Sequence, residues 1–206
     1  MRRSSMAVAA AAAAILAHTP GASAAVIGPS LYSCFDASAV AGCGTSDSPF
    51  ANGSYSYFHL EDFQDGALNT PGISASAGAP LGPGSITDSV DADDGAIDGS
   101  GTAGWSFFGG GSAVVTFTFN ATTLGTLPTD VGIVWTDGLN NYRFDFFDGT
   151  GGLLGSTTNS LGDGTFGGTT ADERFIGWTG SQGVGRLRIT ASTKPSEVDH
   201  PQYGFS

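Results

Sequence analysis

Charged side chains are scarce in this chain of 206 residues, and basic ones are the scarcest. Asp, Glu, Lys and Arg together make up 13% of the residues, about half the usual share, with seven basic residues against 19 acidic ones. Proteins that bind nucleic acid need clustered Lys and Arg side chains to neutralise phosphate groups. The net charge of −12 therefore argues against a nucleic-acid partner.

Long apolar runs are absent as well. The longest, Met6 to Ala17, falls short of the ~20 residues that a membrane-spanning helix needs. It follows a basic start, Met1-Arg2-Arg3, and precedes Ala22-Ser23-Ala24, whose small residues suit a cleavage site. We interpret residues 1–24 as a signal peptide, which predicts a secreted or periplasmic protein without a transmembrane anchor.

The sequence contains only two cysteines, Cys34 and Cys43. Outside the cytoplasm we expect them to form a disulfide, which would close a short loop within an N-terminal leader of residues 25–44. A cysteine-based metal site would need more thiols or nearby histidines, and the sequence offers neither.

Glycine and aromatic residues, by contrast, are plentiful, with 33 Gly, 14 Phe, 5 Tyr and 3 Trp. After residue 55, short runs alternate between apolar and polar residues, and six Asp-Gly dipeptides of the kind found in tight turns are interspersed. In the clearest run, Ala113–Asn120, the side chains of Val115, Phe117 and Phe119 share one face. Such alternation is typical of half-buried β-strands.

The other strand candidates follow the same pattern. The stronger ones are Val131–Thr136, Tyr142–Phe147 and Val184–Thr190, and the weaker ones are Tyr57–Glu61, Ile86–Val90, Gly104–Phe108, Leu153–Ser156, Arg174–Trp178 and Glu197–Tyr203. Residues 66–85 and 157–172 are rich in Gly, Ser and Thr, and we expect loops there. The pattern predicts one all-β domain over residues 45–206, an antiparallel β-sandwich of the jelly-roll or galactose-binding-like type.

Several sequence blocks between Tyr57 and Gly204 carry a family resemblance. They are Phe58–Gly66, Leu68–Gly72, Gly84–Asp91 with Asp94-Gly95, Gly101–Phe107, Leu127–Gly132, Arg174–Trp178, and Glu197–His200 with Gln202–Gly204. In these blocks the chain resembles secreted bacterial proteins that are usually found with a PEP-CTERM sorting tail. The resemblance implies a jelly-roll-like sandwich outside the cytoplasm and no defined activity. The tail itself, a Pro-Glu-Pro motif with a transmembrane stretch and a basic end, does not occur in the sequence, so we expect free release into the periplasm or medium.

A group of aspartates predicts a calcium-binding loop. Five lie within eleven positions, namely Asp88, Asp91, Asp93, Asp94 and Asp98. Oxygen ligands at this density suit calcium. Counted from Asp91, however, Gly95 stands at the fifth position and Thr102 at the twelfth, where an EF-hand requires Glu. The loop would therefore be irregular, and the alternative is a solvated acidic loop that only adds solubility.

The resemblance suggests a second acidic group. Jelly-roll modules of this kind often hold a structural calcium ion between the first strand and the last, and Glu61, Asp62 and Asp199 occupy corresponding ends here. Crowded carboxylates without enough cations would repel one another, which favours a metal. The alternative makes Glu61 and Asp62 exposed charges at a strand end and pairs Asp199 with an arginine such as Arg174.

Trp178 is the candidate ligand-binding residue. The loop Thr179–Gly183 follows it and would place its indole near a rim where a sugar ring could stack. Trp105 and Trp135 alternate with apolar residues, so we expect both in the core. The negative net charge disfavours anionic polymers unless calcium bridges them, whereas neutral sugars need no charge complementarity.

Together these features predict a secreted, calcium-stabilised, non-catalytic binding or extracellular-matrix protein that contacts an envelope or extracellular polysaccharide. One alternative is a secreted glycan hydrolase that uses two carboxyl groups from Glu61, Glu173 and Glu197. The other is a purely structural surface protein. A serine hydrolase is disfavoured, because no Gly-x-Ser-x-Gly elbow accompanies the histidines.

Overall fold

The structure, a computed structural model, describes residues 23–35, 46–93, 97, 100–139, 141–162, 165, 167, 171–192 and 196–206. Most of the expected signal peptide lies outside these ranges, as do Cys43, Asp94 and Asp98. Within them, no helix is long and apolar enough to cross a membrane.

The described residues form two antiparallel sheets. Sheet A has the strand order β1-β10-β7-β12-β5-β4, with β2 also paired to β12, and sheet B has the order β3-β6-β11-β8-β9. The strands of sheet A are β1 (Ala25–Leu31), β2 (Tyr57–Leu60), β4 (Ala79–Leu81), β5 (Ser106–Phe108), β7 (Asp130–Gly138), β10 (Arg174–Thr179) and β12 (Ser196–Phe205). Those of sheet B are β3 (Ile73–Ala75), β6 (Val114–Phe119), β8 (Asn141–Asp148), β9 (Leu153–Ser160) and β11 (Val184–Ala191). The short helices are η1 (Val90–Asp93), η2 (Gly101–Ala103) and α1 (Ala121–Leu124).

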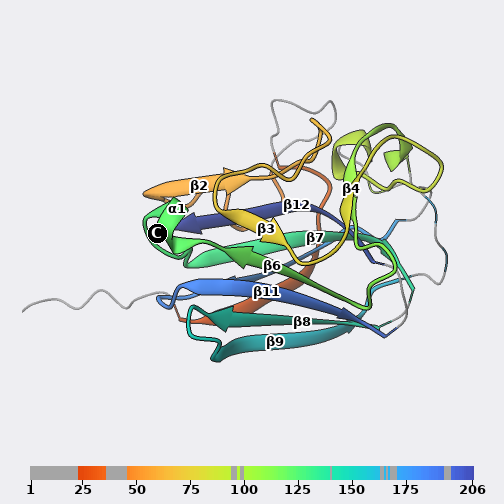
Figure 1. The fold of residues 1–206 in the computed structure, drawn as a ribbon. Helices are drawn as coiled ribbons and strands as arrows, with labels where there is room; N and C mark the ends of the chain where they lie inside the picture. The colour runs from red at the N-terminus through yellow and green to blue at the C-terminus, as the bar shows by residue number, and fades with distance from the viewer. Residues whose placement is uncertain are drawn as a thin grey trace, which may run out of the picture.

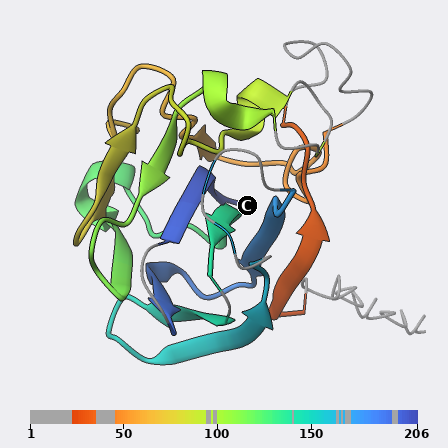
Figure 2. The ribbon, with the colours of Figure 1, turned by 90° about the vertical axis from the view of Figure 1, so that its right-hand side faces the viewer.

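The chain crosses repeatedly between the sheets. From β5 onward it alternates from sheet A to sheet B and back, except at the β8–β9 hairpin, which stays in sheet B. Figure 1 shows β6, β11, β8 and β9 side by side, with α1 and the C-terminus at one end of the sandwich. Figure 2 looks along the strands from the opposite end, where η1 and η2 lie. The expected all-β antiparallel sandwich is confirmed.

Apolar side chains fill the space between the sheets. Val115, Phe117 and Phe119 of β6 are buried there, as the alternating sequence predicted, and they face Ile133 and Trp135 from sheet A. Full burial of such a side chain stabilises the fold by about 1.5–3 kcal/mol. Trp135 is fully buried, as expected, whereas Trp105 is partly buried beneath the loop glycines.

The outer face of sheet A is also covered. Tyr32, Phe50, Val90, Val134 and Phe175 form a second apolar cluster there, and every residue of β7 is consequently buried. In this cluster the Phe175 ring occupies the space above Gly132, where an added Cβ would lie 2.2 Å from the ring. Tyr32 and Phe50, which precede residue 58, are therefore part of the folded core.

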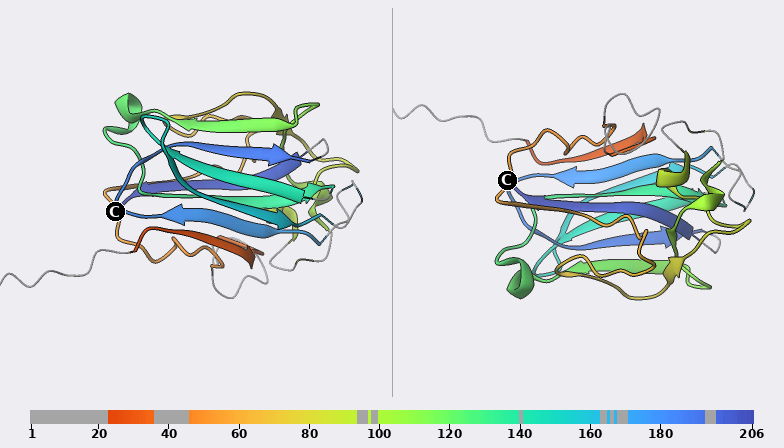
Figure 3. Two further views of the ribbon diagram at one scale, coloured as in Figure 1. Left: turned by 90° about the horizontal axis from the view of Figure 1, so that it is seen from below. Right: turned by 90° about the horizontal axis from the view of Figure 1, so that it is seen from above.

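This covering layer changes the expected boundary of the sandwich. Residues 25–31, predicted to belong to a leader, form strand β1, which pairs with β10 at one margin of sheet A (Figure 3). Two further strands, β3 and β4, lie in a region expected to be loop. The segment Ile86–Val90 is not a strand, because the N–H groups of Thr87 and Asp88 bond to the Gly84 carbonyl and to the Glu197 side chain, respectively, instead of forming a ladder.

Candidate functional site

A buried polar network lies on the outer face of sheet A, beneath η1. We call Tyr32, Asp91, Asp199, His200 and Gln202 the His200 network. The register of β12 against β7 shifts between Asp199 and Gln202, and His200 itself has a positive φ of 45°. Such a bulge breaks strict alternation, so that neighbouring residues of β12 can contact the same covering layer.

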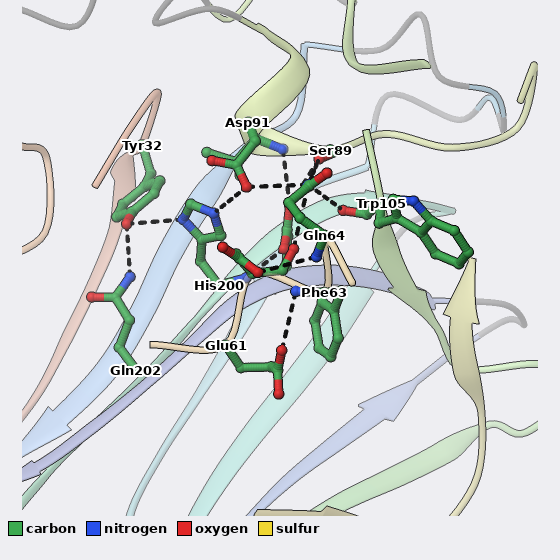
Figure 4. Close-up of polar contacts among 12 residues, drawn as sticks. Tyr32, Glu61, Phe63, Gln64, Ser89, Asp91, Trp105, His200 and Gln202 are labelled. Carbon is green, nitrogen blue, oxygen red and sulfur yellow. Dashed lines mark hydrogen bonds and ion pairs between the residues drawn. The ribbon is translucent and has the colours of Figure 1, made fainter. Parts of the chain in front are cut away.

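The network joins three distant segments of the chain (Figure 4). Gln202 donates from Nε2 to the Tyr32 hydroxyl at 2.8 Å, and that hydroxyl lies 3.2 Å from Nδ1 of His200. On the other side of the ring, Nε2 of His200 lies 3.2 Å from Oδ2 of Asp91. Asp199 accepts hydrogen bonds from the backbone N–H groups of Val90 and His200, at 3.0 Å and 2.7 Å.

Burial and neighbouring charges set the protonation of this network. Burial alone opposes a charge on the His200 ring, but Asp199 and Asp91 raise the pKa of His200 to about 9. Burial also opposes a charge on the Asp199 carboxyl, and this raises the pKa of Asp199 to about 8. For Asp91 the hydrogen bond and charge of His200 outweigh burial, so its pKa is lowered. The His200 ring is only 1% exposed, so its protons are held inside the fold. Asp91 is 28% exposed and, with Gln64, lines a surface hollow of about 290 Å³.

Two buried glutamates near the network accept hydrogen bonds from groups of the protein itself. Oε2 of Glu61 accepts the backbone N–H groups of Asn69 and Thr70 at 2.9 Å and 3.0 Å, and Oε1 accepts the N–H of Phe63. Glu197 accepts hydrogen bonds from the Ser106 hydroxyl and from the N–H of Asp88. Burial raises the pKa of Glu197 to about 8. Both carboxyl groups therefore hold loops of the protein in place.

The structure does not assemble the expected calcium group at the strand ends. Among the described residues, no three His, Cys, Asp or Glu side chains lie close enough to hold a metal ion. The Glu61 carboxylate is directed to its own loop, Asp62 caps the N–H of Gln64, and Asp199 bonds to η1 and His200. The pairing of Asp199 with Arg174 is not observed either, since Arg174 donates to the carbonyl of Glu173.

The aspartate-rich segment is only partly described. Asp88 is fully buried, Asp91 belongs to the His200 network, and Asp93 ends η1. Asp91 from this segment and Asp199 from the strand end therefore both contact His200. Asp94 and Asp98 lie outside the described residues, so calcium binding by this segment stays a prediction.

Trp178 is not the exposed platform that the sequence suggested. Its side chain is 4% exposed and packs in the core, with its ring 6.4 Å from that of Phe146. β1 and Gly155 of β9 cover the indole, and these neighbours are not evident from the local sequence. Cys34 is buried and is not a free thiol, but Cys43 lies outside the described residues, so the Cys34–Cys43 bridge stays a prediction.

The outer face of sheet B carries most of the described basic side chains. We call Arg143 and Phe147 of β8 and Arg186 and Arg188 of β11 the arginine face. Of the four described arginines, only Arg174 lies elsewhere. The guanidinium carbons of Arg186 and Arg188 lie 5.3 Å and 4.8 Å from the centre of the Phe147 ring. Sequence alternation in β11 predicted that Arg186 and Arg188 share a face, but not that β8 supplies Phe147 and Arg143 beside them.

One buried carboxylate partly balances the arginine face. Asp145 is fully buried and accepts hydrogen bonds from Nε of Arg143 at 2.7 Å and from Nη2 of Arg188 at 2.8 Å. Arg186 makes no hydrogen bond or ion pair with any described residue. With Asp148 at the end of β8 included, three guanidinium groups against two carboxylates leave this face with a small excess of positive charge.

Two adjoining hollows open onto the arginine face. The larger, of about 620 Å³, lies at the α1 end of the sandwich, and its polar lining residues are Ser74, Thr118, Asn120, Asp148, Thr150 and Arg186. The smaller, of about 140 Å³, is lined by Thr116, Phe147, Arg186 and Arg188. Because Arg186 lines both, the hollows are neighbours along sheet B. We call them together the sheet B groove.

Comparison with known proteins adds no family to these observations. No protein-family model, no curated protein and no solved structure matches the chain.

Proposed function

We propose that the protein is a non-catalytic polysaccharide-binding protein of the cell exterior and that a sugar chain lies in the sheet B groove. The observation that carries the proposal is the pair of hollows that share Arg186. Their lining combines hydroxyl, amide and guanidinium groups with the phenyl rings of Phe119 and Phe147, which are the groups that hydrogen-bond sugar hydroxyls and pack against sugar rings. The location outside the cytoplasm rests on the signal peptide predicted from the sequence.

Burial of the glutamates favours binding over hydrolysis. A glycosidase places two carboxyl groups on either side of the bond that it cleaves, within reach of the substrate. Glu61, Glu173 and Glu197 are 3%, 0% and 4% exposed. None of them lines either hollow of the sheet B groove. Asp148, the one carboxylate in that lining, is occupied by the N–H groups of its own turn.

A groove-filling variant tests the proposal. Thr118 is exposed and lines the larger hollow, so Thr118→Trp should fill it and abolish binding. Ser54→Trp adds the same side chain at an exposed position outside the groove and should bind as the wild type does. We expect the wild-type protein to bind at least one polysaccharide on a glycan array and to release no reducing ends from it. Failure to bind any glycan, equal binding by Thr118→Trp, or release of product would contradict the proposal.

A further inference from the structure

The arginine face is rich in positive charge, although the chain as a whole is strongly acidic. The sequence has 19 acidic residues and seven basic ones, yet three of the four described arginines gather on one face of sheet B. On a strongly acidic protein, a neutral ligand would need no such concentration of guanidinium groups. Local positive charge attracts an anionic ligand to this face even though the net charge of the protein is negative.

We propose that the polysaccharide bound in the sheet B groove is a uronic-acid polymer, whose carboxylate groups bind Arg186 and Arg188 beside Phe147. This inference rests on the proposed function and names its ligand class. It replaces the neutral sugar expected from the sequence, because that expectation relied on an exposed Trp178, and the indole is buried.

Arg186 is the residue best placed to recognise a carboxylate. Its guanidinium group stands over Phe147 and has no acceptor among the described residues, so its N–H donors can pair with a ligand without breaking a contact. Arg188 lies over the same ring and lines the smaller hollow together with Arg186. A carboxylate in that hollow would accept charge-assisted hydrogen bonds from the guanidinium groups.

The same face already shows how it binds a carboxylate. Asp145 lies between Arg143 and Arg188 and accepts from both, with Nε and Nη2 of Arg188 directed at one oxygen. The planar fork of a guanidinium group matches the planar carboxylate. The excess positive charge left beyond Asp145 is small. It suits a polymer with one carboxylate per sugar better than a densely sulfated one, which the acidic remainder of the surface would repel.

The experiment compares polygalacturonate with the same polymer after its carboxyl groups have been reduced to neutral sugars. Binding is measured by titration calorimetry in EDTA, so that calcium cannot bridge protein and ligand. We expect wild-type protein to bind polygalacturonate at least about tenfold more tightly than the reduced polymer, with an affinity that falls as salt is added. Arg186→Gln should lose about tenfold or more, and Arg186→Lys should lose less, since it keeps the charge without the fork.

Arg174→Gln is the matched control. It removes the same charge from the fourth described arginine, which lies on sheet A, and it should bind as tightly as the wild type. Thermal unfolding of each variant shows whether the fold is retained. Equal affinity for both polymers, with both lost in Thr118→Trp, would overturn the uronate inference and leave the proposed function standing. So would preference for dextran sulfate, a strict need for calcium, or no effect of Arg186→Gln. If neither polymer nor any other glycan is bound, both proposals fail.

Discussion

At the scale of single residues, the Glu61 carboxylate organises the loop after β2. It accepts three backbone N–H groups, from Phe63, Asn69 and Thr70, as well as the Thr70 hydroxyl. The backbone of this loop is strained, because Phe63 has a positive φ of 57° while its ring is fully buried against Phe107. A non-glycine residue in this region costs on the order of 1 kcal/mol or more, so the carboxylate compensates for local strain.

We therefore expect Glu61→Gln to lower the free energy of unfolding by about 1–3 kcal/mol. The variant replaces one carboxylate oxygen with an amide NH2 group, which cannot accept the N–H groups that the carboxylate now binds. Urea denaturation in EDTA measures the loss, and Asp62→Asn is the control, because Asp62 is exposed and should change stability by less than about 0.5 kcal/mol. A Glu61→Gln protein as stable as the wild type in EDTA, but less stable in calcium, would instead support the metal predicted from the sequence.

At the scale of elements, the packing between sheet A and its covering layer depends on a pair of glycines. Gly132 of β7 pairs with Gly177 of β10, and the Phe175 ring fills the space above Gly132. We expect Gly132→Ala to destabilise the protein by about 1–3 kcal/mol, because the new methyl group would force this ring out of place. Gly111→Ala, where an added Cβ meets nothing within 4 Å, is the control and should be nearly neutral. A thermal melt distinguishes them, and equal melting temperatures would show that the covering layer is loosely packed.

Local alternation predicted the strands that have one face in the core. β6, β8 and β11 were found because apolar and polar side chains alternate along them. β1, β3 and β4 were missed because they are margin strands whose sequences alternate weakly or are very short. The signal peptide and the disulfide depend on residues outside the described ranges, so the structure leaves both predictions as they were.

The His200 network could not be predicted from local patterns. Its members come from three distant segments, and the contacts of His200 with Tyr32 and with Asp91 join residues 168 and 109 positions apart. One signal was present, however. Glu197, Asp199 and His200 place three ionisable groups within four residues of a segment that the sequence predicted to be a strand, and the structure shows this strand to be buried. Ionisable groups in a buried strand must find partners, which points to a polar network.

At the scale of the whole molecule, the buried carboxyl groups of β12 and the buried His200 should make the protein less stable as the pH rises. The pKa of Glu197 rises from 4.5 to about 8, and that of Asp199 from 3.8 to about 8. The folded protein therefore keeps protons that the unfolded chain releases above about pH 4–5. The pKa of His200 rises from 6.5 to about 9, so the folded protein also keeps this proton longer.

Each of these groups lowers the free energy of unfolding as pH rises, by up to about 1.4 kcal/mol per pH unit within its own window. We expect stability to be highest near pH 4, to fall from there to about pH 8, where Glu197 and Asp199 ionise in the folded protein, and to fall further to about pH 9, where His200 loses its proton. Below pH 4 the lowered pKa of Asp91 acts in the opposite sense, because protonating this carboxyl removes its interaction with His200.

Urea denaturation from pH 4.5 to 9.5 measures how the free energy of unfolding depends on pH. Glu197→Gln keeps an acceptor for Ser106 and for the N–H of Asp88 but cannot ionise. Between pH 5 and 8 the free energy of unfolding of this variant should therefore fall less steeply than that of the wild type, by the slope that corresponds to about one proton. A wild-type curve that is flat or rises over this range would contradict the assignment, and an unchanged slope in Glu197→Gln would remove Glu197 from it.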